Sequence, residues 1–162
     1  MTFALLLALL QAADPGAATC ATHSDAHAVP LVELYTSEGC SSCPPADRWF
    51  ARQVGRTDAT WLAFHVDYWD SLGWPDRFAS AAYTRRQRQR VAAWASDTVY
   101  TPQVMVGPDI HAPWRDPAAF GSLLQRQRTP SAAGLALQAR RAGAAWHVVL
   151  GVAPLAGGDP SG

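Results

Sequence analysis

The chain has 162 residues, of which 49% are hydrophobic and 16% are charged, and its formal net charge at pH 7 is zero. This length and composition suit one compact domain with some additional structure. The balanced charge gives no electrostatic argument for nucleic-acid binding. Three cysteines are too few for a small fold held together mainly by disulfides, and a chain of this length does not need such cross-links.

The N-terminal segment has the pattern of a secretory signal. Residues 3–10 are an uninterrupted apolar run, too short to span a bilayer as a helix, and small residues follow from Ala12 to Ala21. A lipid attached to Cys20 is an alternative with a weaker motif match. We therefore expect residues 1–28 to be a signal peptide or a disordered segment, and the protein to be exported to the periplasm or secreted. In such an oxidising compartment disulfides persist.

A strand, a turn, two cysteines and a helix follow in that order. The apolar, β-branched run Leu31–Tyr35 predicts a strand, and Cys40 and Cys43 come after a short polar turn with the spacing C-x-x-C. Pro44 and Pro45 then mark the start of a helix, since proline is tolerated in the first helical turn. A C-x-x-C pair between a strand and a helix is typical of a thioredoxin-like redox site.

This position has a chemical consequence for the first sulfur. Cys40 precedes the N-terminus of the expected helix, where free amides and the positive end of the helix dipole favour a thiolate. The amides of Ser42 and Cys43 are the available donors, and Cys43 would be the resolving thiol. A permanent structural disulfide is the alternative. A zinc site is disfavoured, because the sequence has no second C-x-x-C.

A second strand is predicted at Trp61–Asp67, where both faces carry apolar residues, as in a buried parallel strand. Two parallel strands joined by a helix form a right-handed unit whose ligands meet the carboxyl ends of the strands. We therefore expect Asp67, Tyr68 and Trp69 to lie near the two cysteines, with Tyr68 and Trp69 contacting substrate and Asp67 behind them. Further elements are predicted in chain order: a helix at 76–95, a strand at 99–106, a helix at 116–128, and a hairpin of 135–139 with 146–152.

This order of elements resembles the thioredoxin fold. In that superfamily a Thr-Pro pair before the third core strand holds a cis-proline that faces the dithiol, and Thr101-Pro102 occupies this place. The resemblance implies that Pro102 and Thr101 shape a substrate groove. The fold class that it implies is α/β, with a central mixed sheet flanked by helices and a short C-terminal β extension.

Three stretches are similar to a secreted bacterial, thioredoxin-like family of uncharacterised function, domain of unknown function 1223. They are residues 32–47 around C-S-S-C-P-P, residues 65–70 (H-V-D-Y-W-D) with Gly73-Trp74, and residues 100–104 (Y-T-P-Q-V). The similarity implies a thioredoxin-like domain at 29–130 and a C-terminal β hairpin or tail at 131–162. Members of that family continue into further β structure, so we expect a short or truncated member.

One residue departs from the thioredoxin pattern. Thioredoxins carry a buried acid six residues before the first cysteine, which relays a proton to the resolving thiol. Here Leu34 stands at that distance and Glu33 stands seven residues before Cys40. Because strand side chains alternate between faces, Glu33 reaches the dithiol only if the turn contains one extra residue. The sequence does not decide whether Glu33 is the proton relay or a salt-bridged or edge-exposed glutamate.

We therefore expect an exported thiol-disulfide oxidoreductase whose partners are protein thiols, protein disulfides or a redox partner protein, with Cys40, Cys43, Pro102 and Glu33 as catalytic residues. We expect no cofactor, no bound metal, no nucleic acid and no transmembrane span. The alternatives are a non-catalytic binding module with a structural disulfide, and a copper carrier that uses both cysteines and a histidine such as His65.

Overall fold

The structure is a computed structural model that describes residues 18–154. The apolar run expected to be a signal and the last eight residues lie outside this range. The chain divides into two compact units. The larger comprises His27–Pro130, and the smaller comprises the described residues on either side of it, 18–26 and 131–154.

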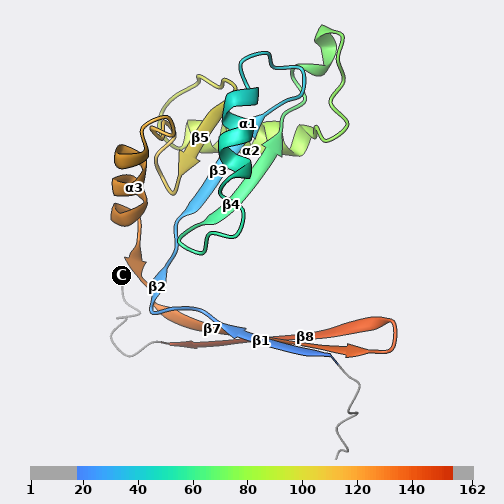
Figure 1. Cartoon of the computed structure of the whole chain (residues 1–162), viewed down its shortest axis with the longest axis vertical. Coiled ribbons are helices and arrows are strands. Elements are labelled where there is room, and N and C mark those ends of the chain that lie inside the picture. Colours follow the sequence, from blue (N-terminus) through green and yellow to red (C-terminus); the bar gives the residue numbers. More distant parts are fainter. Residues whose placement is uncertain (1–17, 155–162) are drawn as a thin grey trace, which may run out of the picture. The chain divides into compact units, whose positions relative to one another are not determined.

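A three-stranded mixed sheet forms the centre of the larger unit (Figure 1). The middle strand, β3 (Leu31–Thr36), pairs in parallel with β4 (Thr60–His65) and antiparallel with β5 (Gln103–Val106). The register aligns Leu34 with Ala63 on β4 and with Val104 on β5. The predicted parallel pair joined by a helix is therefore present, and β3 has hydrogen-bonding partners on both sides.

Three α-helices lie within residues 18–154, and they cover both faces of this sheet. They are α1 (Pro44–Ala51), α2 (Ala81–Ala92) and α3 (Pro117–Arg126). Figure 1 shows α1 in front of the sheet and α2 behind it. Each of the two later helices begins at a side-chain cap: Ser80 accepts a hydrogen bond from the amide of Ala82, and Asp116 accepts two from Ala118 and Ala119. A 3₁₀ turn, η1 (Asp70–Leu72), follows β4.

Alternation along β3 divides the apolar residues between two cores. Val32 and Leu34 join the core on the α1 and α3 face, together with a cluster of aromatic rings from Trp49, Phe50, Trp61, Trp114 and Phe120. Tyr35 joins the core on the opposite face with Met105 of β5 and Val91 of α2. Every side chain of β3 except Leu31 is buried, which fixes the register of the strand.

Two sequence expectations are corrected here. The β4 strand, expected to be buried on both faces, is an edge strand with mostly exposed or half-buried side chains, and Leu62 is 41% exposed. Its apolar pattern could not reveal how many strands would flank it. The helix expected from residue 76 begins instead at Ala81, because residues 76–80 form a loop that ends at the Ser80 cap.

Glu33 requires a further correction. Its side chain is fully buried, but it lies on the same face of β3 as Tyr35, toward α2 and away from α1. There its Oε1 lies 2.5 Å from Nη2 of Arg86, and its Oε2 lies 2.9 Å from Nε of Arg90. The structure therefore resolves the open alternative in favour of an ion pair, and it does not bring Glu33 to the dithiol.

The smaller unit is a three-stranded antiparallel sheet in the order β1-β7-β8. The hairpin of β7 (Ala133–Ala142) and β8 (Ala145–Pro154) was predicted, although it is longer than expected. The first strand, β1 (Thr19–His23), comes from the segment expected to be a signal or disordered. Its pairing with β7 joins residues more than 100 positions apart, which local sequence patterns do not show. Two short strands, β2 (His27–Ala28) and β6 (Thr129–Pro130), pair at the boundaries of the larger unit.

The buried Glu33 cluster provides a test of the fold. The double variant Arg86→Met, Arg90→Met removes both cations and leaves a buried carboxylate unpaired, so the free energy of unfolding at pH 7 should fall by about 3–5 kcal/mol. Urea unfolding measures this loss. The matched control Arg85→Met, Arg88→Met changes two exposed arginines of the same helix and should cost less than about 1 kcal/mol.

Adding Glu33→Gln to the double variant removes the stranded charge and should recover part of the lost stability. If Glu33→Gln recovers nothing, the loss arises from the packing of the two arginine side chains and not from the buried charge.

Candidate functional site

The C-x-x-C pair forms a disulfide at the N-terminus of α1. The sulfur atoms of Cys40 and Cys43 are bonded, and the two Cα atoms are 5.4 Å apart. Cys43 occupies the N-cap position of α1. Successive tight turns lead into the helix, since the amide of Cys40 donates to the carbonyl of Ser37 and the amide of Cys43 donates to that of Cys40. The predicted strand, turn, dithiol and helix thus follow one another in space as they do in the sequence.

Both cysteines are buried, while the residues between them are exposed. Cys40 is 1% exposed and Cys43 is fully buried, whereas Ser41 and Ser42 face solvent. The Ser42 hydroxyl oxygen lies 3.5 Å from the sulfur of Cys40 and 3.4 Å from the carbonyl oxygen of Thr101. Ser42 therefore connects the dithiol loop to the segment that precedes β5.

That segment contains Thr101-Pro102, whose peptide bond is cis. The indole nitrogen of Trp69 donates a 2.8 Å hydrogen bond to the Thr101 hydroxyl. Three of the expected site residues, Thr101, Pro102 and Trp69, therefore gather beside the dithiol loop. Asp67 does not lie there, because it accepts a 2.6 Å hydrogen bond from Thr84 of α2. Tyr68 donates to Gln87 of α2 over 3.3 Å, but its hydroxyl also has the Thr101 side chain as a partner, and its ring lies 6.5 Å from that of Trp69.

A pocket of about 260 Å³ adjoins Pro102. Its walls combine aromatic and basic side chains, with His111, Trp114 and Arg115 from the chain after β5 and Tyr100 from the chain before it. The Tyr100 hydroxyl and the Nδ1 atom of His111 are 2.9 Å apart, which holds the two rings together. The pocket lining contains no acidic side chain, so it presents positive and aromatic groups to whatever enters it.

The buried carboxylate of Asp76 is hydrogen-bonded to the turn that precedes Cys40. Asp76 accepts a 2.8 Å hydrogen bond from the amide of Glu38 and lies 2.5 Å from the Nδ1 atom of His65. Burial alone would raise the pKa of Asp76, but hydrogen bonds from Glu38, His65 and Phe78 outweigh burial and lower it. Gly39, in the same turn, packs closely against Trp69, because a Cβ atom at position 39 would lie 3.3 Å from the Cβ of Trp69.

Sequence reasoning missed a second carboxyl group near the dithiol. Asp47, in the first turn of α1, accepts a 2.7 Å hydrogen bond from the hydroxyl of Thr36, the buried last residue of β3. Burial raises the pKa of the Asp47 carboxyl, although the Thr36 hydrogen bond and the nearby His65 and Arg48 oppose part of that effect. The sequence does contain one indication of Asp47: it follows Cys43 by four residues, and residues at this spacing lie on one face of a helix.

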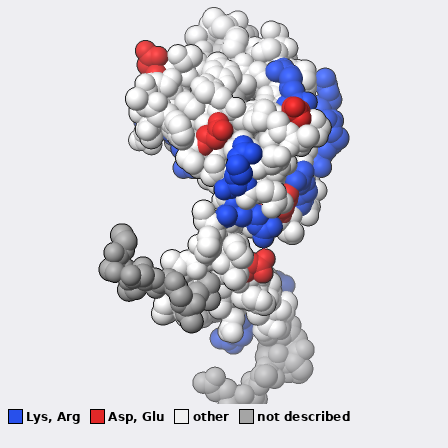
Figure 2. Space-filling view, turned by 90° about the vertical axis from the view of Figure 1, so that its left-hand side faces the viewer, with Lys and Arg blue, Asp and Glu red and all other residues white. Residues whose placement is uncertain are grey.

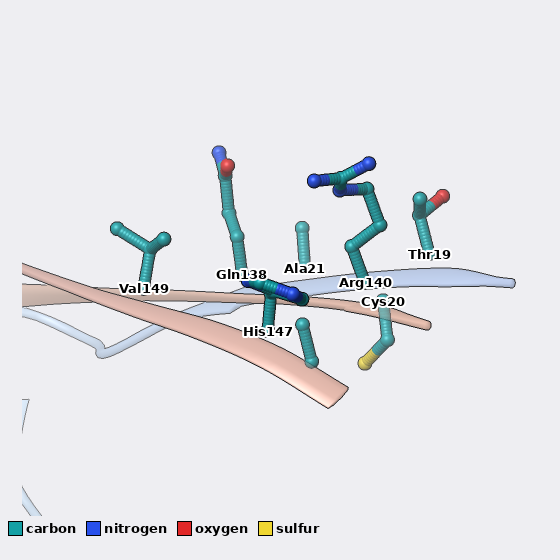
Figure 3. Close-up of a pocket in the computed structure, with 8 residues that line it drawn as sticks. Thr19, Cys20, Ala21, Gln138, Arg140, His147 and Val149 are labelled. Carbon is teal, nitrogen blue, oxygen red and sulfur yellow. The ribbon is translucent and has the colours of Figure 1, made fainter. Parts of the chain in front are cut away.

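The third cysteine belongs to the smaller unit. Cys20 is free and exposed on β1, beside a hollow of about 280 Å³ lined by side chains of β1, β7 and β8. Figure 3 shows Gln138 and Arg140 on one side of the strands and the sulfur of Cys20 on the other. A lone exposed thiol whose sulfur lies on the opposite side of the strands from Gln138 and Arg140 does not define a second site.

Charge and metal-binding groups add little to this description. Figure 2 shows arginine side chains on one face of the molecule with acidic residues interspersed among them, so this face carries both signs. Across residues 18–154, no three His, Cys, Asp or Glu side chains are grouped closely enough to hold a metal ion. Over the same range, no helix combines the length and the apolar character that crossing a bilayer requires.

Comparison with known proteins identifies the family. Residues 31–156 match the model of a family described as protein of unknown function, DUF1223. The chain belongs to this family, and the match spans the dithiol, the Thr101-Pro102 segment and the hairpin of β7 and β8. The search of curated proteins gave no significant match.

One solved structure is similar. It is the crystal structure of a structural-genomics target protein from Agrobacterium tumefaciens, 37% identical over the aligned part, with a TM-score of 0.49. The alignment covers 58% of this chain and 43% of that one, so the chain spans less than half of the length of this relative.

The role of Asp76 can be measured by its pH dependence. A carboxyl group with a lowered pKa in the folded state contributes stability that is complete above its unfolded value, about 4, and is lost as pH falls through the folded value. Asp76→Asn should therefore reduce the free energy of unfolding at pH 7 by about 1–3 kcal/mol. The difference from the parent chain should shrink progressively below about pH 4.

Urea unfolding between pH 2 and 7 measures this difference. Asp97→Asn, at an exposed position, is the matched control and should change stability by less than about 0.5 kcal/mol at every pH. A constant difference between Asp76→Asn and the parent across this range would mean that the Asp76 charge does not stabilise the turn.

Proposed function

We propose that this chain is an exported thiol-disulfide oxidoreductase with a thioredoxin-like fold, acting on protein thiols or disulfides. The observation that carries the proposal is the position of the Cys40–Cys43 disulfide, at the N-terminus of α1 and linked through Ser42 to Thr101. A helix N-terminus stabilises a thiolate, and the Thr101-Pro102 segment with the adjoining pocket offers a surface for a substrate chain.

The exchange would proceed in two steps. In the reduced protein the Cys40 thiolate attacks a substrate disulfide, forming a mixed disulfide and releasing one substrate thiolate, which takes up a proton. Cys43 then loses its proton and attacks the Cys40 sulfur, which re-forms the internal disulfide and releases the second substrate thiol. Two electrons pass from the dithiol to the substrate. The same steps run in reverse when the disulfide form oxidises a substrate dithiol.

Ser42 is placed to support the first step. Its hydroxyl lies within 3.5 Å of the Cys40 sulfur, and a hydroxyl can donate a hydrogen bond to a thiolate. The hydroxyl can alternatively donate to the Thr101 carbonyl oxygen, so it connects the reacting sulfur with the proposed substrate surface. Neither serine of the C-x-x-C loop carries a charge that would set the direction of electron flow.

A second candidate function rests on the burial of the two sulfurs. With Cys40 only 1% exposed, the disulfide has the character of a structural cross-link that resists exchange. In that case the protein would be a binding module, and the pocket beside Pro102 would be its ligand site. The oxidoreductase proposal requires the loop of exposed serines to move far enough for a substrate sulfur to reach Cys40.

The reduction potential of the pair separates the two functions. Titration with glutathione redox buffers, in a Cys20→Ser background that leaves only the pair to react, should give a potential near or above about −230 mV, as in catalytic pairs. A potential below about −300 mV would indicate a structural disulfide and would favour the binding module.

Trapping distinguishes the roles of the two cysteines. In the same background, Cys43→Ser should accumulate a mixed disulfide at Cys40 when the reduced protein meets a disulfide substrate, because the resolving thiol is absent. Cys40→Ser should accumulate far less, since it lacks the proposed nucleophile, whose sulfur lies 3.5 Å from the Ser42 hydroxyl oxygen. Mass spectrometry of the intact protein measures both. Equal trapping by the two variants would contradict the assignment of Cys40 as the nucleophile.

A further inference from the structure

One carboxyl group is placed to serve the resolving cysteine, and it comes from α1. Asp47 follows Cys43 by four residues, and its amide donates a 3.1 Å hydrogen bond to the Cys43 carbonyl, which closes one helical turn between them. Residues four apart lie on the same face of a helix, and helical side chains point toward the N-terminus. The Asp47 side chain is therefore directed along α1 toward the turn that holds Cys43.

A buried hydroxyl fixes this carboxyl group against the sheet. Thr36 is 1% exposed and donates its 2.7 Å hydrogen bond to Oδ1 of Asp47. The other carboxyl oxygen, Oδ2, is not used in this bond. Asp47 is half-buried, so it can exchange protons with solvent while one oxygen remains fixed.

Side chains alternate between the two faces of β3, and this alternation prevents Glu33 from serving Cys43. Glu33 lies on the α2 face, where Arg86 and Arg90 neutralise it, whereas Thr36 lies on the α1 face. Glu38 is exposed in the turn, and Asp67 is engaged with Thr84. Among the acids near the C-x-x-C loop, Asp47 is the one held on the same helical face as Cys43.

We propose that Asp47 is the acid–base group of the dithiol, taking the proton from the Cys43 thiol as Cys43 attacks the mixed disulfide. The inference rests on the proposed oxidoreductase function. The Cys43 S–H bond breaks and its proton passes to the Asp47 carboxylate, directly or through one water. The Cys43 thiolate then bonds to the Cys40 sulfur, the bond from Cys40 to the substrate sulfur breaks, and the departing substrate thiolate takes up the proton that Asp47 releases.

The electrostatic surroundings suit this role. Burial moves the pKa of Asp47 upward, toward the pH at which the protein would work, and an acid–base group is most effective when the two are close. The charged and titratable groups that act on it are Arg48 on α1, His65 on β4 and Asp76 in the loop before α2. Arg48 and His65 favour the carboxylate and Asp76 opposes it.

The test uses the full chain in the Cys20→Ser background, reduced and then mixed with oxidised glutathione as the probe. Rapid acid quenching and mass spectrometry follow the formation of the glutathione adduct and its resolution separately, between pH 5 and 9.5. Asp47→Asn should slow resolution on the order of 10- to 100-fold at pH 7, because general base catalysis is lost. Adduct formation at Cys40 should change less than about twofold.

The pH profile distinguishes a proton-transfer role from a structural one. The defect of Asp47→Asn should shrink above about pH 9, where a free thiol ionises without a base. Asparagine can still accept the Thr36 hydrogen bond, so a purely structural role for Asp47 would leave both rates nearly unchanged. Asp47→Glu should restore part of the resolution rate. The matched control Glu38→Gln removes an exposed acid from the preceding turn and should leave both steps unaltered.

The outcomes separate the two proposals. If the parent forms and resolves the adduct and Asp47→Asn does so at the same rates throughout, the acid–base role of Asp47 is wrong while the oxidoreductase function stands. If the parent forms no adduct at any pH, the oxidoreductase function fails, and the role of Asp47 fails with it.

Discussion

The alternation of side chains along β3 is the constraint on which the site depends. The strand is hydrogen-bonded on both sides and buried along nearly its whole length, so its register cannot shift by one residue without exposing an entire core face. Val32, Leu34 and Thr36 therefore face α1, and Glu33 and Tyr35 face α2. This division decides which polar groups can reach the dithiol and which belong to the opposite core.

The same division separates the buried acid Glu33 from the half-buried acid Asp47. Glu33 is fully buried but is balanced by Arg86 and Arg90, so it stabilises the α2 face and is not directed toward the dithiol. Asp47 faces the other side of the sheet; Arg48 and His65 act on it only through their charge, and its hydrogen-bond partner is the neutral hydroxyl of Thr36. A carboxyl group held by a neutral donor can still take up a proton, which an ion-paired carboxylate does only at considerable cost.

The two proposed functions differ in what they require of the dithiol loop. Its cysteines are buried, and the serines between them are exposed. Ser42 touches both Cys40 and Thr101, while Asp76 and Gly39 fix the turn on the other side of Cys40. The loop is thus held at both ends and exposed at its centre. Exchange chemistry needs that centre to open, whereas a structural cross-link needs it to stay closed.

Local sequence patterns determined the strand, the C-x-x-C turn, the helix that begins at the two prolines, the Asp116 cap and the C-terminal hairpin, because each depends on neighbouring residues. Tertiary structure decided what depends on distant partners. It made β4 an edge strand, joined β1 to β7 across more than 100 residues, and turned Asp67 and Tyr68 toward α2. The acid beside the dithiol was decided in the same way, because a spacing of four residues indicates a shared helical face, but only the packing of α1 on β3 brings Asp47 to Thr36.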